Sequence, residues 1–316
     1  MAARWLLPLA LLSFFSTPAL SLEALSYWTH PSCAVKYGNE GLEKLVDEAI
    51  ESTKMALDGL MGNDPDILEC FNQIFKFDFN SPGADNDAHF DMFLGVMAGP
   101  GGVKNVVEAG SREPSTLRMY CNNQERYGDE PRDDDPILTI KNTQLPAHAQ
   151  SWIDKENDII IMGPPTRIAK PEFAVMYVET TAYVHKKAGE PDERTTLDVF
   201  DDFKSVTREY IWPERLTSFP TSFTDTKGKK RPAIDRFYNI GSNTMQHELT
   251  HAVLPKALRT KDHARGWDAS RLLSAEKSVN NADCYTALTT CARLVKDFKL
   301  KMDASGNGDL VDMLAT

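Results

Sequence analysis

The residues best suited to chemistry lie in the stretch His247-Glu248-Leu249-Thr250-His251. The two histidines are four residues apart, so in a helix both imidazoles leave the same face, one turn apart. Each can then reach one zinc ion at about 2.0–2.1 Å through a ring nitrogen. Glu248 projects beside such an ion, where its carboxylate can take a proton from a zinc-bound water. The spacing is that of the HExxH motif of zinc-dependent peptidases. A helix whose histidines are merely solvated or hydrogen-bonded is the alternative interpretation.

A helix over about residues 243–254 is predicted to carry this motif at its centre. Ser242 or Asn243 can serve as its N-cap, because their side-chain oxygens can accept hydrogen bonds from the first turn. Pro255 lacks the backbone N–H that a continuing helix needs, so the helix is expected to end just before it.

A third metal ligand is required, because zinc hydrolases use three protein ligands and leave one position open for water. The chain beyond the motif offers several side chains with suitable donor atoms. They are Asp262, His263, Asp268, Glu276, Asp283, Cys284, Cys291 and Asp297. Spacing alone does not choose among them.

Three segments resemble motifs of the deuterolysin family, the fungal secreted zinc endopeptidases also called aspzincins. Residues 260–266, with the sequence TKDHARG, resemble the family's T-x-D-x-x-Y-G motif. Residues 273–275 and 280–285 resemble its L-S-A and N-N-A-D-S-Y segments. The resemblance covers about residues 247–290 and is weaker over residues 33–162.

The resemblance implies a role for each matching residue. His247, His251 and Asp262 would hold one zinc ion, and Glu248 would be the general base. Asp283 would face a basic side chain after the scissile bond, as implied in the related lysine-specific enzymes, or would instead orient a ligand. The resemblance also implies a Cys33–Cys121 disulfide, and Cys70 with Cys291 is a second candidate pair.

Arg265 stands where the family has a tyrosine that is implied to donate a hydrogen bond to the oxyanion. Arginine can also donate, and its fixed charge suits an oxyanion, so Arg265 is the candidate catalytic donor. Its longer side chain can place the group differently. The alternative function is therefore a secreted zinc-binding protein on the same scaffold with little or no activity.

The hydrophobic periodicity predicts both helices and strands, and the family resemblance implies an α+β, zincin-like fold with a helical N-terminal part, a small sheet and the HExxH helix. We expect one domain over residues 22–300, helical over 33–110 and catalytic over 116–298, followed by a tail over 301–316. Predicted helices cover residues 39–61, 66–75, 85–97, 103–109, 195–210 and 274–298, and predicted strands cover 116–121, 137–140 and 158–162. Residues 212–235, which include a basic cluster, are predicted to form a long surface loop.

The composition is that of an acidic globular protein, with 41% hydrophobic residues in 316 and a net charge of −11. This charge argues against nucleic acid and anionic membranes as partners. We expect protein or peptide substrates and a monomer.

Residues 1–21 are predicted to be a secretory signal peptide. They have a basic start at Arg4, an apolar run over Trp5–Phe15 and small residues before Leu22. Secretion would expose all five cysteines to an oxidising compartment. Cys284 and Cys291 should not pair with each other, because two turns of helix separate them by about 10.5 Å.

Overall fold

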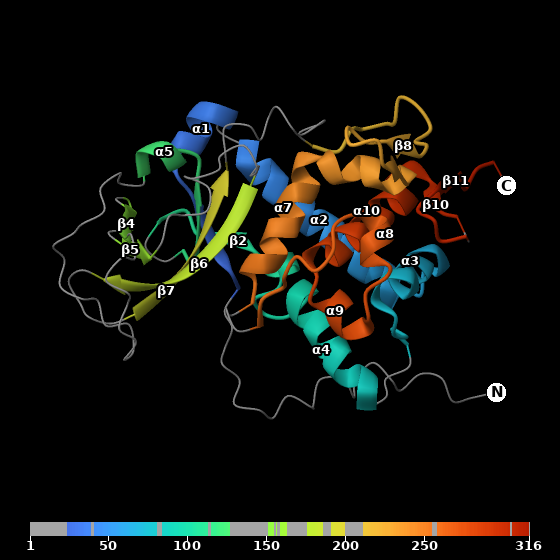
Figure 1. The fold of residues 1–316 in the computed structure, drawn as a ribbon, viewed down its shortest axis with the longest axis horizontal. Coiled ribbons are helices and arrows are strands. Elements are labelled where there is room, and N and C mark those ends of the chain that lie inside the picture. Colours follow the sequence, from blue (N-terminus) through green and yellow to red (C-terminus); the bar gives the residue numbers. More distant parts are fainter. Residues whose placement is uncertain are drawn as a thin grey trace.

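The computed structural model describes residues 24–38, 41–80, 84–112, 115–126, 151–154, 156, 159–162, 176–185, 191–199, 211–254, 258–303 and 305–315. The predicted signal peptide and the strand at 137–140 lie outside these ranges. The described chain combines helices with a mixed sheet, which agrees with the α+β prediction. Most helices gather on one side of the molecule and the sheet lies on the other (Figure 1).

Three of the predicted helices are present near their predicted bounds. They are α2 (Gly41–Met61), α3 (Pro65–Phe75) and α4 (Ala84–Met97), and a short α1 (Pro31–Tyr37) precedes them. α3 begins where expected from its sequence, because the Asp64 carboxylate accepts hydrogen bonds from the backbone N–H groups of Asp66 and Ile67. α2 turns an apolar stripe toward the core, as its periodicity predicts.

The predicted helix at 103–109 is wrong. Val103–Asn105 form one 3-10 turn, and Val107–Glu108 form the short strand β2. The Val107 N–H donates to Leu25 O at 2.9 Å and the Ala109 N–H to Tyr27 O at 3.1 Å. These donors therefore bond to the neighbouring strand β1 (Ser26–Thr29) instead of to a helical turn.

In the described residues the main sheet has the order β2-β1-β3-β7-β6-β5-β4, parallel from β2 to β7 and antiparallel from β7 to β4. The predicted strands at 116–121 and 158–162 are confirmed as β3 (Leu117–Tyr120) and β5 (Ile159–Met162). The other members are β4 (Ser151–Asp154), β6 (Met176–His185) and β7 (Pro191–Val199). A short α5 (Asn123–Arg126) follows β3.

The predicted helix at 195–210 is wrong over its first five residues, which belong to β7. Leu117–Tyr120 of β3 pair with residues 195–198 on one side, and β6 pairs with them on the other. A segment flanked by two strands has its backbone groups fixed by distant parts of the chain, so the local pattern did not decide its structure. Residues 200–210 lie outside the described chain.

The predicted helix at 274–298 is divided into α9 (Ala275–Val279) and α10 (Ala282–Phe298). Ser274 caps α9 as predicted. The break at Asn280 and Asn281 arises because Lys261 of a distant loop bonds there: its N–H donates to Asn280 O at 2.8 Å, and its carbonyl accepts from the Ala282 N–H at 3.0 Å. The chain then forms a hairpin of β10 (Leu300–Met302) and β11 (Leu310–Asp312) over part of the expected tail.

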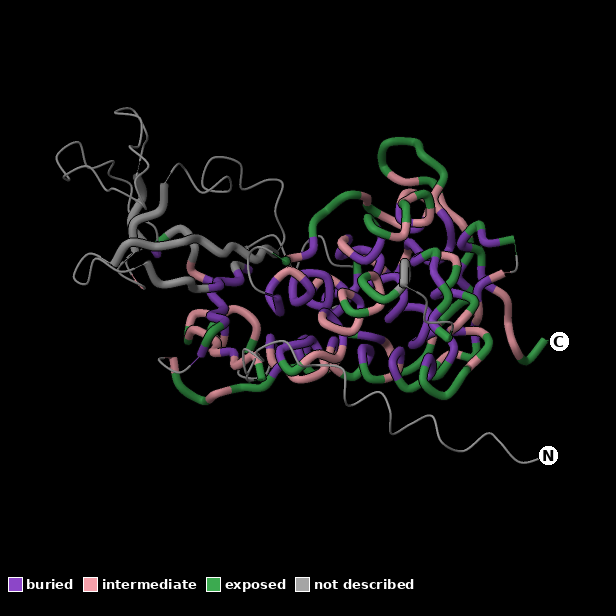
Figure 2. The backbone as a smooth tube through the Cα atoms, turned by 90° about the horizontal axis from the view of Figure 1, so that it is seen from below, coloured by how far each residue is buried: buried purple, intermediate pink, exposed green. Residues whose placement is uncertain are grey.

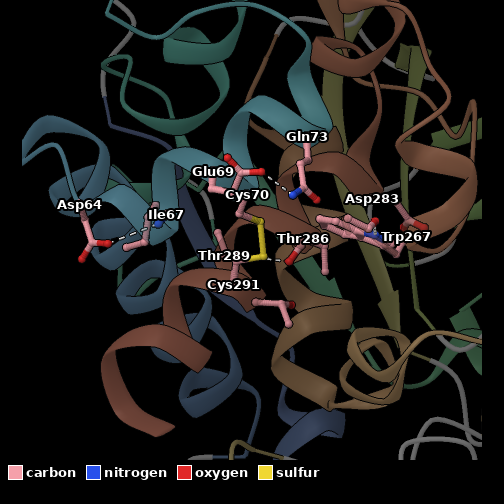
Figure 3. Close-up of a disulfide and its surroundings, with 12 residues drawn as sticks. Asp64, Ile67, Glu69, Cys70, Gln73, Trp267, Asp283, Thr286, Thr289 and Cys291 are labelled. Atoms are coloured by element: carbon pink, nitrogen blue, oxygen red, sulfur yellow. Dashed lines mark hydrogen bonds between the residues drawn. A yellow bond between two sulfur atoms is a disulfide. The ribbon is translucent and has the colours of Figure 1, made fainter. Parts of the chain in front are cut away.

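Both predicted disulfides are present, Cys33–Cys121 and Cys70–Cys291, and Cys284 is buried without a disulfide partner. The second disulfide joins α3 to α10, with Asp283 and Trp267 drawn beyond it (Figure 3). Buried segments run through the helical side of the molecule (Figure 2). None of the helices in the described ranges is long and apolar enough to cross a membrane.

Candidate metal centre

The HExxH stretch lies in α7 (Gly241–Ala252), a helix placed by buried contacts. The predicted N-cap is wrong, because Ile240 holds the N-cap position and no side chain caps the helix. Asn243 instead donates to Phe237 O at 2.8 Å and to Thr290 Oγ1 at 3.1 Å. Met245 and Leu249 are fully buried, so one face of α7 packs into the core. The histidines at 247 and 251 are left on another face.

His247, His251 and Asp262 converge at one point. The two histidine Nε2 atoms are 3.2 Å apart, and Asp262 Oδ1 lies 3.1 Å from His247 Nε2 and 3.3 Å from His251 Nε2. These three donor atoms could hold a metal ion. Asp262 is thus the candidate third ligand that the structure brings to the histidines. The side chains of His247 and His251 are 11% and 15% exposed and that of Asp262 is 39% exposed, so the cluster opens to solvent beside Asp262.

The Nδ1 atom of each histidine contacts a hydrogen-bond acceptor, which orients the imidazole ring. His251 Nδ1 lies 2.9 Å from Thr260 O, and His247 Nδ1 lies 2.7 Å from Asp283 Oδ1. A carbonyl or a carboxylate can only accept, so each Nδ1 carries the hydrogen in these contacts. Each Nε2 faces the cluster, and once it gives up its proton to bind a metal it offers the lone pair that a metal ligand needs.

Asp283 holds two parts of the site together. It is almost fully buried in the first turn of α10. Its Oδ1 contacts His247 as described, and its Oδ2 accepts from the Gly266 N–H at 2.7 Å. Both carboxylate oxygens therefore bond to groups of the protein, which is the arrangement of an acceptor that orients a ligand.

The loop that carries Asp262 is fixed at several backbone positions. Besides the Lys261 contacts with the α9–α10 break, the Ala264 N–H donates to Asn281 Oδ1 at 3.0 Å. Gly266 has a φ of +77°, and a Cβ added there would lie 2.9 Å from Asp235 Oδ2. Only glycine fits this turn without strain.

Trp267 and Asp235 support the same loop, and no motif in the sequence marks either of them. Trp267 begins the one-turn helix α8 (Trp267–Ser270); its N–H donates to Asp235 Oδ1 at 2.8 Å, and its indole Nε1 donates to Gly306 O at 2.9 Å. Asp235 lies in a 3-10 helix (Ala233–Asn239) that follows a hairpin of β8 (Phe223–Thr224) and β9 (Lys230–Arg231). The predicted surface loop therefore ends in a buried carboxylate, and burial raises its pKa to about 6.

The electrostatics of the cluster favour positive charge at its centre. Burial lowers the pKa of His247, but hydrogen bonds with Asp262 and Asp283 outweigh burial and raise this pKa to about 10. Burial raises the pKa of Asp262, but hydrogen bonds from His247 and His251 outweigh it and hold the pKa well below its usual range. A bound cation would benefit from the same surroundings.

The two predicted catalytic groups differ in their exposure to solvent. Glu248 is buried in α7 and its charge acts on His247. Arg265 is 77% exposed, and its Nη2 lies 3.3 Å from Asp262 Oδ2, the oxygen that points away from the histidines. The predicted role of Arg265 at an oxyanion stays a prediction.

A comparison of the sequence with protein-family models and with curated proteins finds no match. The function of the cluster therefore has to be inferred from its own residues.

Proposed function

We propose that the protein is a zinc-dependent endopeptidase of the deuterolysin type, with His247, His251 and Asp262 as the zinc ligands. The observation that carries the proposal is the triangle of donor atoms, whose sides measure 3.1, 3.2 and 3.3 Å. A tetrahedral zinc ion with bonds of about 2.0–2.1 Å separates its ligand atoms by about 3.3 Å. Imidazole and carboxylate donors also suit zinc.

The surrounding contacts support a metal of this kind. Metal-binding histidines usually donate their second ring N–H to a carboxylate or a carbonyl, as His247 and His251 do here with Asp283 and Thr260. The resemblance of three segments to deuterolysin motifs supports the proposed family. Both oxygens of Asp283 bond to protein groups, so its proposed role is to orient His247 and not to meet a lysine or arginine side chain after the scissile bond.

If His247, His251 and Asp262 hold a zinc ion, that ion would lower the pKa of a bound water to about 7 and polarise the peptide carbonyl. Glu248 takes a proton from the attacking water and passes it to the leaving amine. Asp283 keeps the Nδ1 hydrogen of His247 turned away from the cluster. Substrate approaches from the side of Asp262, where the cluster is most exposed.

One observation favours the second candidate, a zinc-binding protein without peptidase activity. The Arg265 guanidinium forms an ion pair with Oδ2 of Asp262, which is itself a proposed zinc ligand. The Arg265 side chain would have to rotate away from Asp262 to donate a hydrogen bond to an oxyanion. Losing one oxyanion donor typically costs about 100- to 1000-fold in rate. An Arg265→Tyr variant that gains activity would favour this second candidate for the natural sequence.

Metal removal tests the proposal. We expect the purified protein to contain one zinc ion per chain, as measured by elemental analysis, and to cleave unfolded casein. Treatment with 1,10-phenanthroline should abolish cleavage, and added zinc should restore it, because the hydrolytic water needs the metal. The isomer 1,7-phenanthroline, which does not chelate, is the matched control. Stoichiometric zinc without cleavage would select the second candidate, and absence of bound zinc would refute both.

A second prediction concerns Asp283. The Asp283→Asn substitution removes a negative charge and one of two acceptor oxygens, so the hold on His247 weakens. The dissociation constant for zinc should rise by about 10- to 100-fold. Competition with a chromophoric chelator measures this constant. Asp268→Asn, which removes the same charge from α8 outside the cluster, should leave it unchanged. Equal affinities for Asp283→Asn and the natural protein would contradict the role given to Asp283.

Disulfides fit an oxidising compartment, and we propose that the protein is secreted and acts on proteins or peptides.

A further inference from the structure

A pocket whose lining does not include the metal cluster lies between α2 and the β2 edge of the main sheet. Its volume is about 830 Å³, and its lining includes Tyr27, Asp47, Glu108 and Ile211. None of His247, His251 and Asp262 lines it. Binding in this pocket is therefore independent of the proposed function.

The floor of this pocket contains a buried phenol. Tyr27 is only 3% exposed, and its hydroxyl, which has no hydrogen-bond partner within the described chain, reaches the solvent of the pocket. Buried tyrosines usually find a partner for the hydroxyl. Tyr27 pairs in register with Glu108 on the neighbouring strand, so both side chains lie on the same face of the sheet. The open end of that face is the pocket.

Carboxylates surround this phenol. Burial, and then the charges of Glu108, Asp47 and Glu43, raise the pKa of Tyr27 well above its usual range. Glu43 and Asp47 lie on one face of α2, four residues apart, where like charges repel. The carboxylates of Asp47 and Glu108 have no hydrogen bond or ion pair to any other described residue.

Three lysines line the same pocket, and none of them forms an ion pair with Asp47 or Glu108 in the described chain. They are Lys44, Lys54 and Lys104, and none of them is among the charges that act on Tyr27. The other two lining carboxylates are already engaged, Glu51 by Arg293 and Glu48 by the Trp212 N–H. The unmatched negative charge is therefore concentrated where Asp47 and Glu108 face Tyr27.

The carboxylates around Tyr27 do not form a converging group of three metal-binding donors among the described residues. Among the described residues, the cluster of acidic, histidine and cysteine donors that converges within 4.8 Å is that of His247, His251 and Asp262. The carboxylates around Tyr27 suit a larger cation that hydrogen-bonds at several points. An ammonium or guanidinium group on a flexible stem meets this description, because the apolar Ile211 and Val107 can contact its methylene groups.

The edge of the sheet adds a second means of recognition. In the described chain β2 is the terminal strand and pairs with β1 alone. Val107 and Glu108 are exposed, and a terminal strand offers unpaired backbone groups to an added strand. Extended peptides bind to sheet edges in this way, with alternate side chains entering pockets.

We propose that this pocket binds an extended basic peptide, with one lysine or arginine side chain directed at Tyr27 between Asp47 and Glu108, and with its backbone along β2. The charged group donates to the two carboxylates and to the phenol oxygen. The peptide backbone pairs with the free edge of the strand.

Isothermal titration of the full chain with N-acetyl-tetralysine amide tests this proposal. The chain carries Glu248→Gln, so that the probe is not cleaved. We expect saturable binding, and the double variant Asp47→Asn/Glu108→Gln should weaken it by about tenfold or more, because two charge-assisted hydrogen bonds are lost. Tyr27→Phe keeps the buried ring and should weaken binding by several-fold.

Two controls separate this site from general attraction to an acidic protein. Asp58→Asn/Glu214→Gln removes the same two charges from exposed positions outside the pocket and should change affinity by less than about twofold. Spermine carries the same charge as the probe without a peptide backbone and should bind more weakly. Absence of saturable binding, an equal loss in the control variant, or spermine binding as tightly as the peptide would each overturn the proposal.

Discussion

Replacing Glu248 by glutamine is expected to slow casein hydrolysis by about 100- to 10,000-fold, because the general base is lost. Glutamine has nearly the same shape, so α7 and its packing should be preserved. The three donor atoms of His247, His251 and Asp262 are untouched, and zinc content should stay at one ion per chain. Initial rates on casein and elemental analysis of the same preparation provide the two measurements.

The pairing of these two measurements makes the result specific to the role of Glu248. A variant that lost zinc together with activity would indicate a structural role for this side chain. Glu214→Gln, an exposed position distant in sequence from α7, is the matched control and should retain full activity. Casein cleavage at an unchanged rate in Glu248→Gln would refute the proposed mechanism.

Replacing Trp267 by alanine is expected to lower the free energy of unfolding by about 3–5 kcal/mol. The side chain is fully buried, and its removal leaves a cavity and takes away one of the two donors to the Gly306 carbonyl, the other being Arg271 Nη1. Alanine keeps the backbone N–H that bonds to Asp235, but the packing and the indole hydrogen bond that hold the loop after Gly266 are lost, so zinc affinity should fall with stability. Urea denaturation measures the first effect and chelator competition the second.

Two further substitutions isolate the causes of this loss. Trp267→Phe keeps most of the ring and removes the indole hydrogen bond, and we expect it to cost about 1 kcal/mol for that bond, with a smaller cavity term. Leu272→Ala, five residues further on and largely exposed, should change stability by less than about 0.5 kcal/mol. If Trp267→Ala unfolds at the same urea concentration as Leu272→Ala, the support assigned to Trp267 is wrong.

The parts of the site that could be predicted are those encoded within one turn or one motif. The four-residue spacing of His247 and His251 determines their common face wherever the helix lies, and the family resemblance named Asp262. Asp235 and Trp267 could not be predicted, because their roles depend on backbone donors and acceptors that the fold brings from far along the chain. No local pattern marks such a contact.

The errors in the predicted fold have the same origin. Thr195–Val199 form a strand because β3 and β6 supply partners on both sides, and residue spacing contains no information about those partners. The break before α10 depends on Lys261, a residue that precedes it by 19 positions and bonds to its open backbone groups. The amphipathic helices α2 and α3 were predicted well, because each buries a stripe that its own sequence defines.

The hairpin of β10 and β11 affects when the metal cluster can form during synthesis. The Gly306 carbonyl that supports Trp267 follows His247, His251 and Asp262 in the chain, so a ribosome produces all three before their support. Until residues 300–312 have emerged from the ribosome, Trp267, which follows the Gly266 turn, lacks its hydrogen bond to the Gly306 carbonyl. Maturation of the cluster is therefore coupled to the late stage of translation, which delays its assembly until most of the protein has been made.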